Sequence, residues 1–199
     1  MSRYVIGLTG GIACGKSNVS RALAAEGIVI ADADAISHEL TAPGGRALPG
    51  IRECFGDDVF DGDALNRRAL GEKVFAAPQA LERLNRVIHP LIFEEIDRRL
   101  SEAEGIAVLE APLLYECALE DRCDEVWCCY LPQKEQVKRL MGRDGLTRNA
   151  AMQRIKAQMS AREKAKRADF VIRTDGTAEE SANKARERLN GIRKRLEEA

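Results

Sequence analysis

Residues 10–17 read Gly-Gly-Ile-Ala-Cys-Gly-Lys-Ser, which matches the phosphate-binding loop pattern G-x-x-x-x-G-K-[ST]. An apolar run at residues 4–8 precedes this loop, and a spacing typical of a helix follows it. We expect Gly10 and Gly15 to adopt backbone conformations closed to residues with a Cβ, so that successive N–H groups point at one anion. The helix that starts near Lys16 adds its positive partial charge. The stretch therefore predicts a nucleoside triphosphate site.

Two side chains of the loop have the chemistry that a triphosphate needs. Lys16 can reach the β- and γ-phosphates, and the hydroxyl of Ser17 is placed to bind Mg²⁺. Backbone N–H groups do most of the remaining binding, so we expect the loop to tolerate changes in its other side chains. The predicted nucleotide-binding residues are Gly11, Ile12, Ala13, Cys14, Gly15, Lys16, Ser17 and Asn18.

The composition is that of an ordinary soluble globular protein, with 45% hydrophobic and 32% charged residues among 199. The formal net charge of −1 argues against a general nucleic-acid or membrane-surface binder. No apolar run approaches the ~18 residues of a membrane-spanning helix, and no signal peptide is evident, so we expect a cytoplasmic protein. The six cysteines lack metal-binding spacing and are expected to be reduced, with Cys14 open to thiol chemistry.

Apolar runs that alternate with helical patterns predict an α/β fold with a parallel sheet and right-handed crossovers. The five expected strands cover residues 4–8, 28–31, 106–111, 125–130 and 170–172. A helix is expected over residues 65–75, after a turn-rich stretch at 57–63. A second helix is expected to break at His89-Pro90 and to restart over residues 91–100. The helical stretch between the second and third strands is more than a crossover needs.

Acidic side chains follow two of the predicted strands. Asp32 and Asp34 come directly after residues 28–31, and Glu110 lies at the end of the strand at 106–111. In open parallel sheets, ligand-contacting groups gather beyond the carboxyl ends of the strands. These carboxylates could therefore hold Mg²⁺ or take a proton from an attacking hydroxyl. We expect one of the two aspartates to cap the helix that follows, and Glu110 could equally bind a backbone N–H group.

A basic segment runs from Arg139 to Arg167, with nine lysines and arginines against two acids and therefore a net charge of +7. It predicts a lid whose Arg139 or Arg143 neutralises phosphate charge on closure, although a solvated basic helix face remains the alternative. Arg67 lies near the start of a predicted helix, where a cation is disfavoured unless an anion or a carboxylate compensates. A solvated face is equally open there. The lone His89 is expected to be a structural hydrogen-bonding residue.

Segments spread over nearly the whole chain resemble the dephospho-coenzyme A kinase family. They come in the family's order and spacing, at residues 9–12 running into 15–17, 32–36, 65–70, 89–92, 112–116 and 168–172. The resemblance implies a P-loop NTPase-type five-stranded parallel sheet with flanking helices, a helical substrate-binding insertion and a helical lid. It also implies transfer of the γ-phosphoryl group of ATP to the ribose 3′-hydroxyl of dephospho-coenzyme A, with Mg²⁺ as the cofactor.

The resemblance divides this single domain, residues 1–199, into three parts. The nucleotide-binding core would comprise residues 1–35, 105–138 and 168–199. Residues 36–104 would form the helical acceptor-binding part, and residues 139–167 the lid. ATP and dephospho-coenzyme A would be the partners, with no nucleic acid, no membrane and no obligate protein partner.

The family's site residues are carried over only at matching positions. Asp34 matches the proposed base at the 3′-hydroxyl, and Lys16, Arg139 and Arg143 complete the implied catalytic set. The implied acceptor contacts are Asp34, Arg67, His89, Pro112 and Leu113, and the implied metal contacts are Ser17, Asp32 and Glu110.

Two positions depart from the family's pattern. The pair Ala13-Cys14 stands where the family usually has glycine and a small polar residue, which affects the loop geometry expected at Ala13. The pair Arg173-Thr174 replaces an acidic-amide pair near the adenine. Two rival functions also stay open: another small-molecule kinase acting on a nucleoside or nucleotide, and a nucleotide-dependent binding module with no acceptor.

Overall fold

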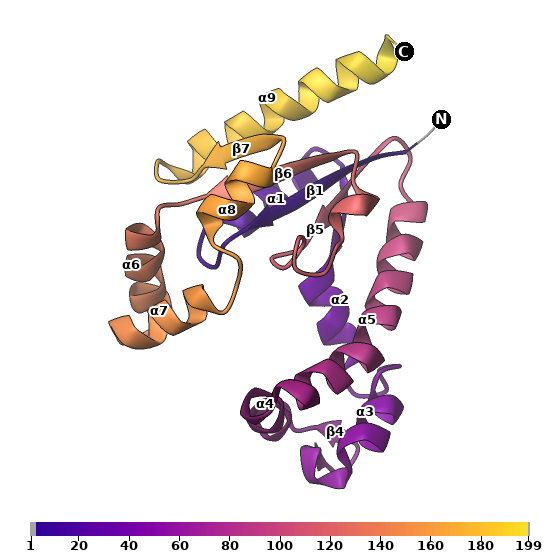
Figure 1. The fold of residues 1–199 in the computed structure, drawn as a ribbon. Helices are drawn as coiled ribbons and strands as arrows, with labels where there is room; N and C mark the ends of the chain where they lie inside the picture. Colours follow the sequence, from indigo (N-terminus) through magenta and orange to yellow (C-terminus); the bar gives the residue numbers. More distant parts are fainter. Residues whose placement is uncertain (1–2, 199) are drawn as a thin grey trace. The chain divides into compact units, whose positions relative to one another are not determined.

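The computed structural model describes residues 3–198, which pack into two compact units (Figure 1). One unit contains the residues up to Ala31 together with those from Glu102 onward, and the other is Asp32–Ser101. The sheet has the strand order β2 (Val29–Asp32), β5 (Ile106–Glu110), β1 (Tyr4–Gly10), β6 (Glu125–Tyr130) and β7 (Phe170–Arg173). The pairs β1–β5, β1–β6 and β6–β7 are parallel. The predicted five-stranded α/β fold is confirmed.

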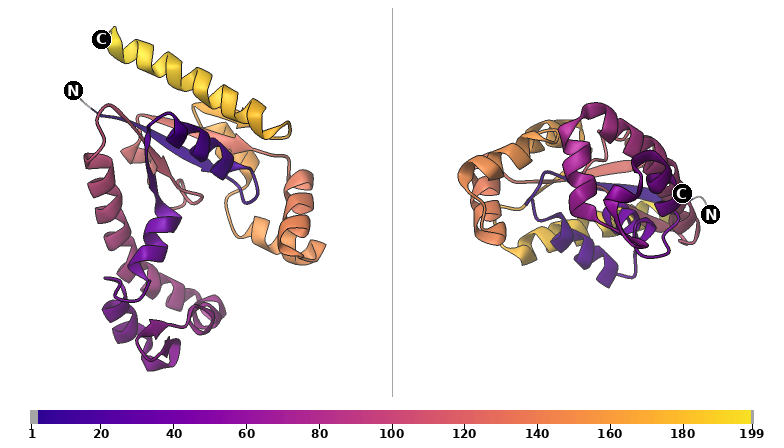
Figure 2. Two further views of the ribbon diagram at one scale, coloured as in Figure 1. Left: turned by 180° about the vertical axis from the view of Figure 1, so that it is seen from behind. Right: turned by 90° about the horizontal axis from the view of Figure 1, so that it is seen from below.

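The core of the larger unit lies on both faces of the sheet, which explains the continuous apolar runs of its central strands. Ile6, Leu8 and Trp127 are fully buried within it. Helices α1 (Lys16–Ala25) and α9 (Ala178–Glu197) pack against each other, while α8 (Ala161–Arg167) covers the opposite face of the sheet from α1 (Figures 1 and 2). Helix α1 ends before Gly27, whose φ of 79° is the left-handed conformation common after a helix C-terminus.

The predicted lid segment comprises the second half of α6 (Gln133–Asp144), all of α7 (Arg148–Lys156) and α8. Val137 and Leu140 of α6 form a small apolar core with Ala151 and Ile155 of α7. Two residues of the phosphate-binding loop, Ile12 and Ala13, pack against this core. The helices that follow β6 therefore contact the loop directly.

The smaller unit is helical. It contains α2 (Ala33–Leu40), α3 (Leu48–Phe55), the short 3₁₀ helix η1 (Asp57–Val59), the two-stranded β3 (Phe60–Asp61) and β4 (Ala64–Leu65), α4 (Arg67–Ala76) and α5 (Pro78–Ser101). The expected start of a helix at Leu65 is wrong, because Leu65 pairs with Phe60 in the small hairpin. Asn66 then caps α4 by accepting a hydrogen bond from the N–H group of Ala69.

The predicted break at His89-Pro90 is also wrong, because α5 continues through Pro90. Proline removes one helical hydrogen bond and crowds the preceding turn, and a helix can answer by bending. Figure 1 shows α5 changing direction part-way along its length. Ile88 on one side of Pro90 and Ile96 on the other are both buried, and this packing offsets the cost of the proline.

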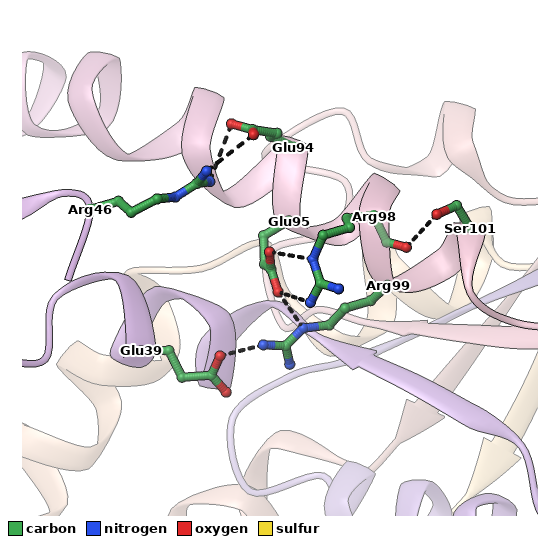
Figure 3. A network of polar contacts seen from close by, with 7 residues as sticks. All are labelled: Glu39, Arg46, Glu94, Glu95, Arg98, Arg99 and Ser101. Atoms are coloured by element: carbon green, nitrogen blue, oxygen red, sulfur yellow. Dashed lines mark hydrogen bonds and ion pairs between the residues drawn. The ribbon is translucent and has the colours of Figure 1, made fainter. Parts of the chain in front are cut away.

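Charged side chains fasten α2 to α5 within this unit (Figure 3). The Glu95 carboxylate accepts hydrogen bonds from Arg98 at 2.7 Å and from Arg99 at 2.9 Å, and Arg99 also pairs with Glu39 of α2. The hydrogen bonds from Arg98 and Arg99 lower the pKa of Glu95 to about 2. Glu95 is thus held in its charged form through nearly the whole pH range.

None of the helices in residues 3–198 is at once long enough and apolar enough to cross a membrane.

Candidate nucleotide-binding site

The phosphate-binding loop joins β1 to α1 and contains two residues in the left-handed region. Gly15 has φ 75° and is the N-cap of α1, so its lack of a side chain leaves the start of the helix open to an anion. Ala13 has φ 62°, at a cost of about 1–2 kcal/mol for a residue with a Cβ. The expectation that Gly10 takes such a conformation is wrong. Gly10 belongs to β1, and a Cβ there would lie 2.7 Å from the carbonyl oxygen of Cys129.

Lys16, the first residue of α1, forms an ion pair with Glu110 at the end of β5. The ammonium Nζ lies 2.5 Å from Oε1 of Glu110. Glu110 is adjacent in register to Leu8 of β1, so the parallel pairing of the two strands brings its carboxylate to the loop. The partner of Glu110 in this contact is thus a side-chain ammonium, and not a backbone N–H group as in the alternative. The site combines a lysine, a carboxylate and the open end of a helix.

Arg139 of α6 contacts the loop from the side of β7. Its Nη1 donates to the carbonyl oxygen of Ala13 at 3.4 Å, and its Nη2 donates to that of Thr174 at 2.5 Å. The Thr174 hydroxyl in turn donates to the carbonyl oxygen of Cys14 at 2.8 Å. Arg143, the other predicted lid arginine, pairs instead with Asp144 on the surface. The structure therefore brings Arg139 to the loop, with Thr174 as a second support.

Cys14 is enclosed beneath the loop, and its thiol lies 3.2 Å from the Nε2 atom of Gln136. Nε2 also donates to the carbonyl oxygen of Leu131 at 2.8 Å, so the buried Gln136 side chain joins the loop to the end of β6. Burial raises the pKa of the Cys14 thiol to about 11. The expectation that Cys14 is open to thiol chemistry is therefore wrong, because a buried, protonated thiol is unreactive.

The last two predicted loop residues differ in their surroundings. Ser17 is exposed in the first turn of α1. The Asn18 amide donates to the carbonyl oxygen of Ala178 at 2.7 Å and approaches the hydroxyl of Ser181 at 3.3 Å. Asn18 thus fastens the start of α1 to the start of α9, and Ser17 keeps its hydroxyl available.

Two acidic residues lie where β2 passes into α2, Asp32 as the last residue of the strand and Asp34 two residues later. Asp32 is the N-cap of α2, because its Oδ1 accepts hydrogen bonds from the N–H groups of Asp34 at 2.9 Å and Ala35 at 3.2 Å. The expectation that one aspartate caps this helix is confirmed. Asp34 lies in the first turn of the same helix.

The remaining predicted acceptor residues of the smaller unit, Arg67 and His89, have partners within that unit. Arg67 donates from Nη2 to the carbonyl oxygens of His38 and Thr41, both at 3.3 Å. Its charge is thus compensated by the carbonyl end of α2. The His89 ring lies 5.6 Å from that of Phe93, and burial lowers its pKa. A lowered pKa keeps this imidazole neutral at pH 7.

Pro112 and Leu113 open the segment that follows β5. The carbonyl oxygen of Pro112 accepts hydrogen bonds from the Thr9 hydroxyl at 3.4 Å and from Nζ of Lys164. Leu113 is 40% exposed, a high fraction for a leucine beside the core. The backbone of this segment is therefore held at Pro112, while the side chain of Leu113 is accessible from solvent.

The sequence did not reveal how three residues support the site, namely Gln136, Lys164 and Thr174, although the resemblance places Thr174 near the adenine. Each acts through a partner more than thirty residues away or through a backbone carbonyl. Lys164 gave one usable signal, because it shares a helical face with the buried Ala161.

Residues 4–180 match the family model for dephospho-CoA kinase. The chain belongs to the dephospho-CoA kinase family. A dephospho-CoA kinase of Geobacter sulfurreducens is 45% identical, over 88% of this chain and 92% of the relative. This confirms the predicted family, and membership favours a dephospho-CoA kinase over the nucleoside or nucleotide kinase alternative.

Solved structures agree with the fold of this dephospho-CoA kinase family member. A crystal structure from Thermus thermophilus superposes with a TM-score of 0.83 at 33% identity, covering 96% of this chain and 98% of the other. The dephospho-CoA kinase from Campylobacter jejuni gives a TM-score of 0.66 at 25% identity, covering 96% and 97%.

Proposed function

We propose that this protein transfers the γ-phosphoryl group of ATP to the ribose 3′-hydroxyl of dephospho-coenzyme A in the cytoplasm. The observation that carries the proposal is the family match over residues 4–180, supported by relatives named for this activity. The intact phosphate-binding loop between β1 and α1 agrees with it.

The loop binds the triphosphate through its backbone N–H groups and the start of α1, with Gly11 to Asn18 as the contacting stretch. When ATP binds, the Lys16 ammonium contacts the β- and γ-phosphates, either in place of Glu110 or together with it. Arg139, held beside the loop by the carbonyls of Ala13 and Thr174, neutralises charge that develops on the transferred group.

The donor set near Lys16 fits Mg²⁺. Ser17 offers an exposed hydroxyl and Glu110 a carboxylate, both hard oxygen ligands. Asp32 of the smaller unit is a further candidate ligand only through the family resemblance. Within residues 3–198, no group of three or more His, Cys, Asp or Glu side chains is arranged to hold a metal. Mg²⁺ ordinarily keeps several waters and substrate phosphates as ligands, so one or two protein oxygens suffice. When bound, the ion would neutralise charge on the phosphate oxygens.

Asp34 serves as the base that takes the proton of the acceptor hydroxyl. It stands in the first turn of α2, two residues beyond the end of β2. The helical residues 36–104, with Arg67 and His89, hold the acceptor together with Pro112 and Leu113. Within residues 139–167, the proposed lid, α6 and α7 close and bring Arg143 to the nucleotide, while α8 stays packed on the sheet.

Mass spectrometry of the product tests this proposal directly. The protein is incubated with Mg-ATP and dephospho-coenzyme A, and separately with nucleosides and nucleoside monophosphates. We expect coenzyme A as the product and turnover of the other acceptors to be at least a hundredfold slower. Faster phosphorylation of a nucleoside or a monophosphate would favour the rival kinase, and ATP-dependent binding of a protein without any phosphorylated acceptor would favour a binding module.

A further inference from the structure

Lys164 of α8 is a charged side chain enclosed by the protein. Its side chain is 0% exposed, and a buried ammonium is tolerated only when it is paired and hydrogen-bonded. Nζ donates to the carbonyl oxygen of Pro112 and lies 2.9 Å from the carboxylate of Glu116. No step of the reaction described above uses this lysine. Its position therefore calls for a role of its own.

The partner carboxylate makes a second contact with the same region. Glu116 accepts a hydrogen bond at 2.8 Å from the N–H group of Met159, just before α8 begins. At the other end of α8, the guanidinium of Arg167 lies 4.6 Å from the ring centre of Tyr115. The segment from Met159 to Arg167 is thus attached at its start, its middle and its end to residues 112–116.

The ammonium lies where three parts of the nucleotide-binding unit meet. The carbonyl oxygen of Pro112 also accepts from Thr9 of β1, and Ala111 donates to the carbonyl oxygen of Leu8 at 3.0 Å. On the loop side, a Cβ on Gly11 would lie 3.1 Å from the methyl group of Ala161 in α8. The contacts of Lys164 therefore join α8 to the segment that directly follows Glu110.

We propose that Lys164 is a positioning residue for phosphoryl transfer: it fixes Pro112 and the residues after it against the end of β1. Lysine suits the place because its three N–H donors can serve a carbonyl and a carboxylate at once. An apolar side chain of similar length would remove the ammonium from both acceptors, leaving the Pro112 carbonyl only the long contact with Thr9 and Glu116 only the N–H group of Met159. The segment that offers Leu113 to the acceptor would then lose its fixed position, and a displacement of about 1 Å is costly to catalysis.

A comparison of Lys164→Met with Lys166→Met tests the proposal. Lys166 lies two residues further along α8 with a 62% exposed side chain, so it controls for loss of a lysine on the same helix. We expect Lys164→Met to lower kcat/KM for dephospho-coenzyme A at least tenfold while its ATP affinity changes less than twofold. Lys166→Met should match the wild type in both. A merely structural lysine would leave kcat and KM per folded molecule unchanged.

Amide hydrogen exchange supplies a local readout. In folded Lys164→Met, we expect residues 112–119 to exchange at least tenfold faster while β1 keeps its protection. The double variant Lys164→Met with Glu116→Gln removes both charges and restores much of any lost stability, but not the positioning. Values of kcat/KM within twofold of Lys166→Met in both variants, or faster exchange spread over the whole unit, would overturn the proposal.

If the Lys164 variants do not fold, Glu116→Gln alone tests the positioning role. The glutamine oxygen can still accept the hydrogen bond from the N–H group of Met159, but its contact with Lys164 is weaker because the charge is lost. A fall of at least threefold in kcat/KM is expected, and an unchanged value overturns the proposal. The inference rests on the proposed function, yet the two can fail separately. If the wild type leaves dephospho-coenzyme A unmodified, the proposed function is wrong. Amide exchange in residues 112–119 still tests whether Lys164 holds this segment in place.

Discussion

Lys16 and Glu110 form an ion pair that is almost closed to solvent, with side chains 13% and 5% exposed and 2.5 Å between Nζ and Oε1. Removing one partner of such a pair leaves the other as an uncompensated buried charge. The pair therefore stabilises the fold and, in the proposed function, holds the phosphate-binding lysine in place before ATP arrives.

Lys16→Met should lower the free energy of unfolding by about 3 kcal/mol and weaken ATP binding at least tenfold. Adding Glu110→Gln should restore most of the stability but not the ATP affinity, because the stranded charge is gone while the phosphate contact is still missing. Urea unfolding and titration calorimetry measure the two effects. Lys194→Met, with a 77% exposed side chain, is the control. Unchanged ATP affinity in Lys16→Met would contradict the loop assignment.

Asp34→Asn should reduce turnover of dephospho-coenzyme A by about 10²-fold or more while leaving ATP affinity within twofold, because the amide cannot take the hydroxyl proton. Steady-state kinetics and ATP calorimetry separate the two quantities. Asp63→Asn, a fully exposed aspartate of the same unit, is expected to behave as the wild type. Near-normal turnover of Asp34→Asn would remove this carboxylate from its proposed role.

Ala13→Gly should raise the free energy of unfolding by up to about 1 kcal/mol, because glycine takes a positive φ without the Cβ penalty. The matched control is Ala24→Gly on the exposed face of α1, where glycine should instead cost about 0.5–1 kcal/mol. Thermal or urea unfolding distinguishes the opposite signs. Equal losses in both variants would show that Ala13 is not strained.

Cys14 should resist alkylation in the folded protein, since burial holds its thiol protonated at pH 8, well below its raised pKa of about 11. Cys54, which is half-buried, should react with iodoacetamide at least tenfold faster. Peptide mass spectrometry after timed labelling measures both rates, and labelling in urea shows that all six cysteines can react. Equal rates in the folded protein would place Cys14 at the surface.

Glu95 should make stability depend on pH in the acid range. Its pKa is lowered to about 2 in the folded protein, from 4.5. The stabilisation is therefore fully present above pH 4.5 and is lost as the pH falls towards 2. Urea unfolding should show Glu95→Gln to be less stable than the wild type at pH 7, with the difference shrinking between pH 4.5 and 2. Glu94→Gln, whose partner Arg46 is exposed, should show a smaller difference at every pH.

Local sequence patterns correctly predicted those helices and strands whose tertiary surroundings favour the same structure as the local pattern. The strand at 125–130 was predicted with both of its bounds, because its apolar run follows Asp124 and Glu125 and stops shortly before Pro132. The capping role of one aspartate at the end of β2 was likewise predictable, since an N-cap bonds only to the residues that directly follow it. The fold class followed from these local signals and from the order of strands and helices.

Long-range packing decided what the sequence could not. Pro90 was expected to end a helix, but burial on both sides of it sustains α5. Ala13 was expected to affect the loop geometry, yet only the structure shows that it adopts the left-handed conformation expected of Gly10. The supports of the loop, Thr174 and Gln136, serve carbonyl groups of distant segments, and no spacing in the sequence reveals such partners.

The crowding around the first two glycines of the loop has a consequence for mutagenesis. A methyl group on Gly10 would press on the backbone of Cys129, and one on Gly11 would press on both Ala161 and Gln136. An inactive alanine variant at either position would therefore report a displaced scaffold rather than a lost contact with ATP. Substitutions at an exposed position such as Ser17 have room for the new side chain, so they can test contacts with ATP without displacing the loop.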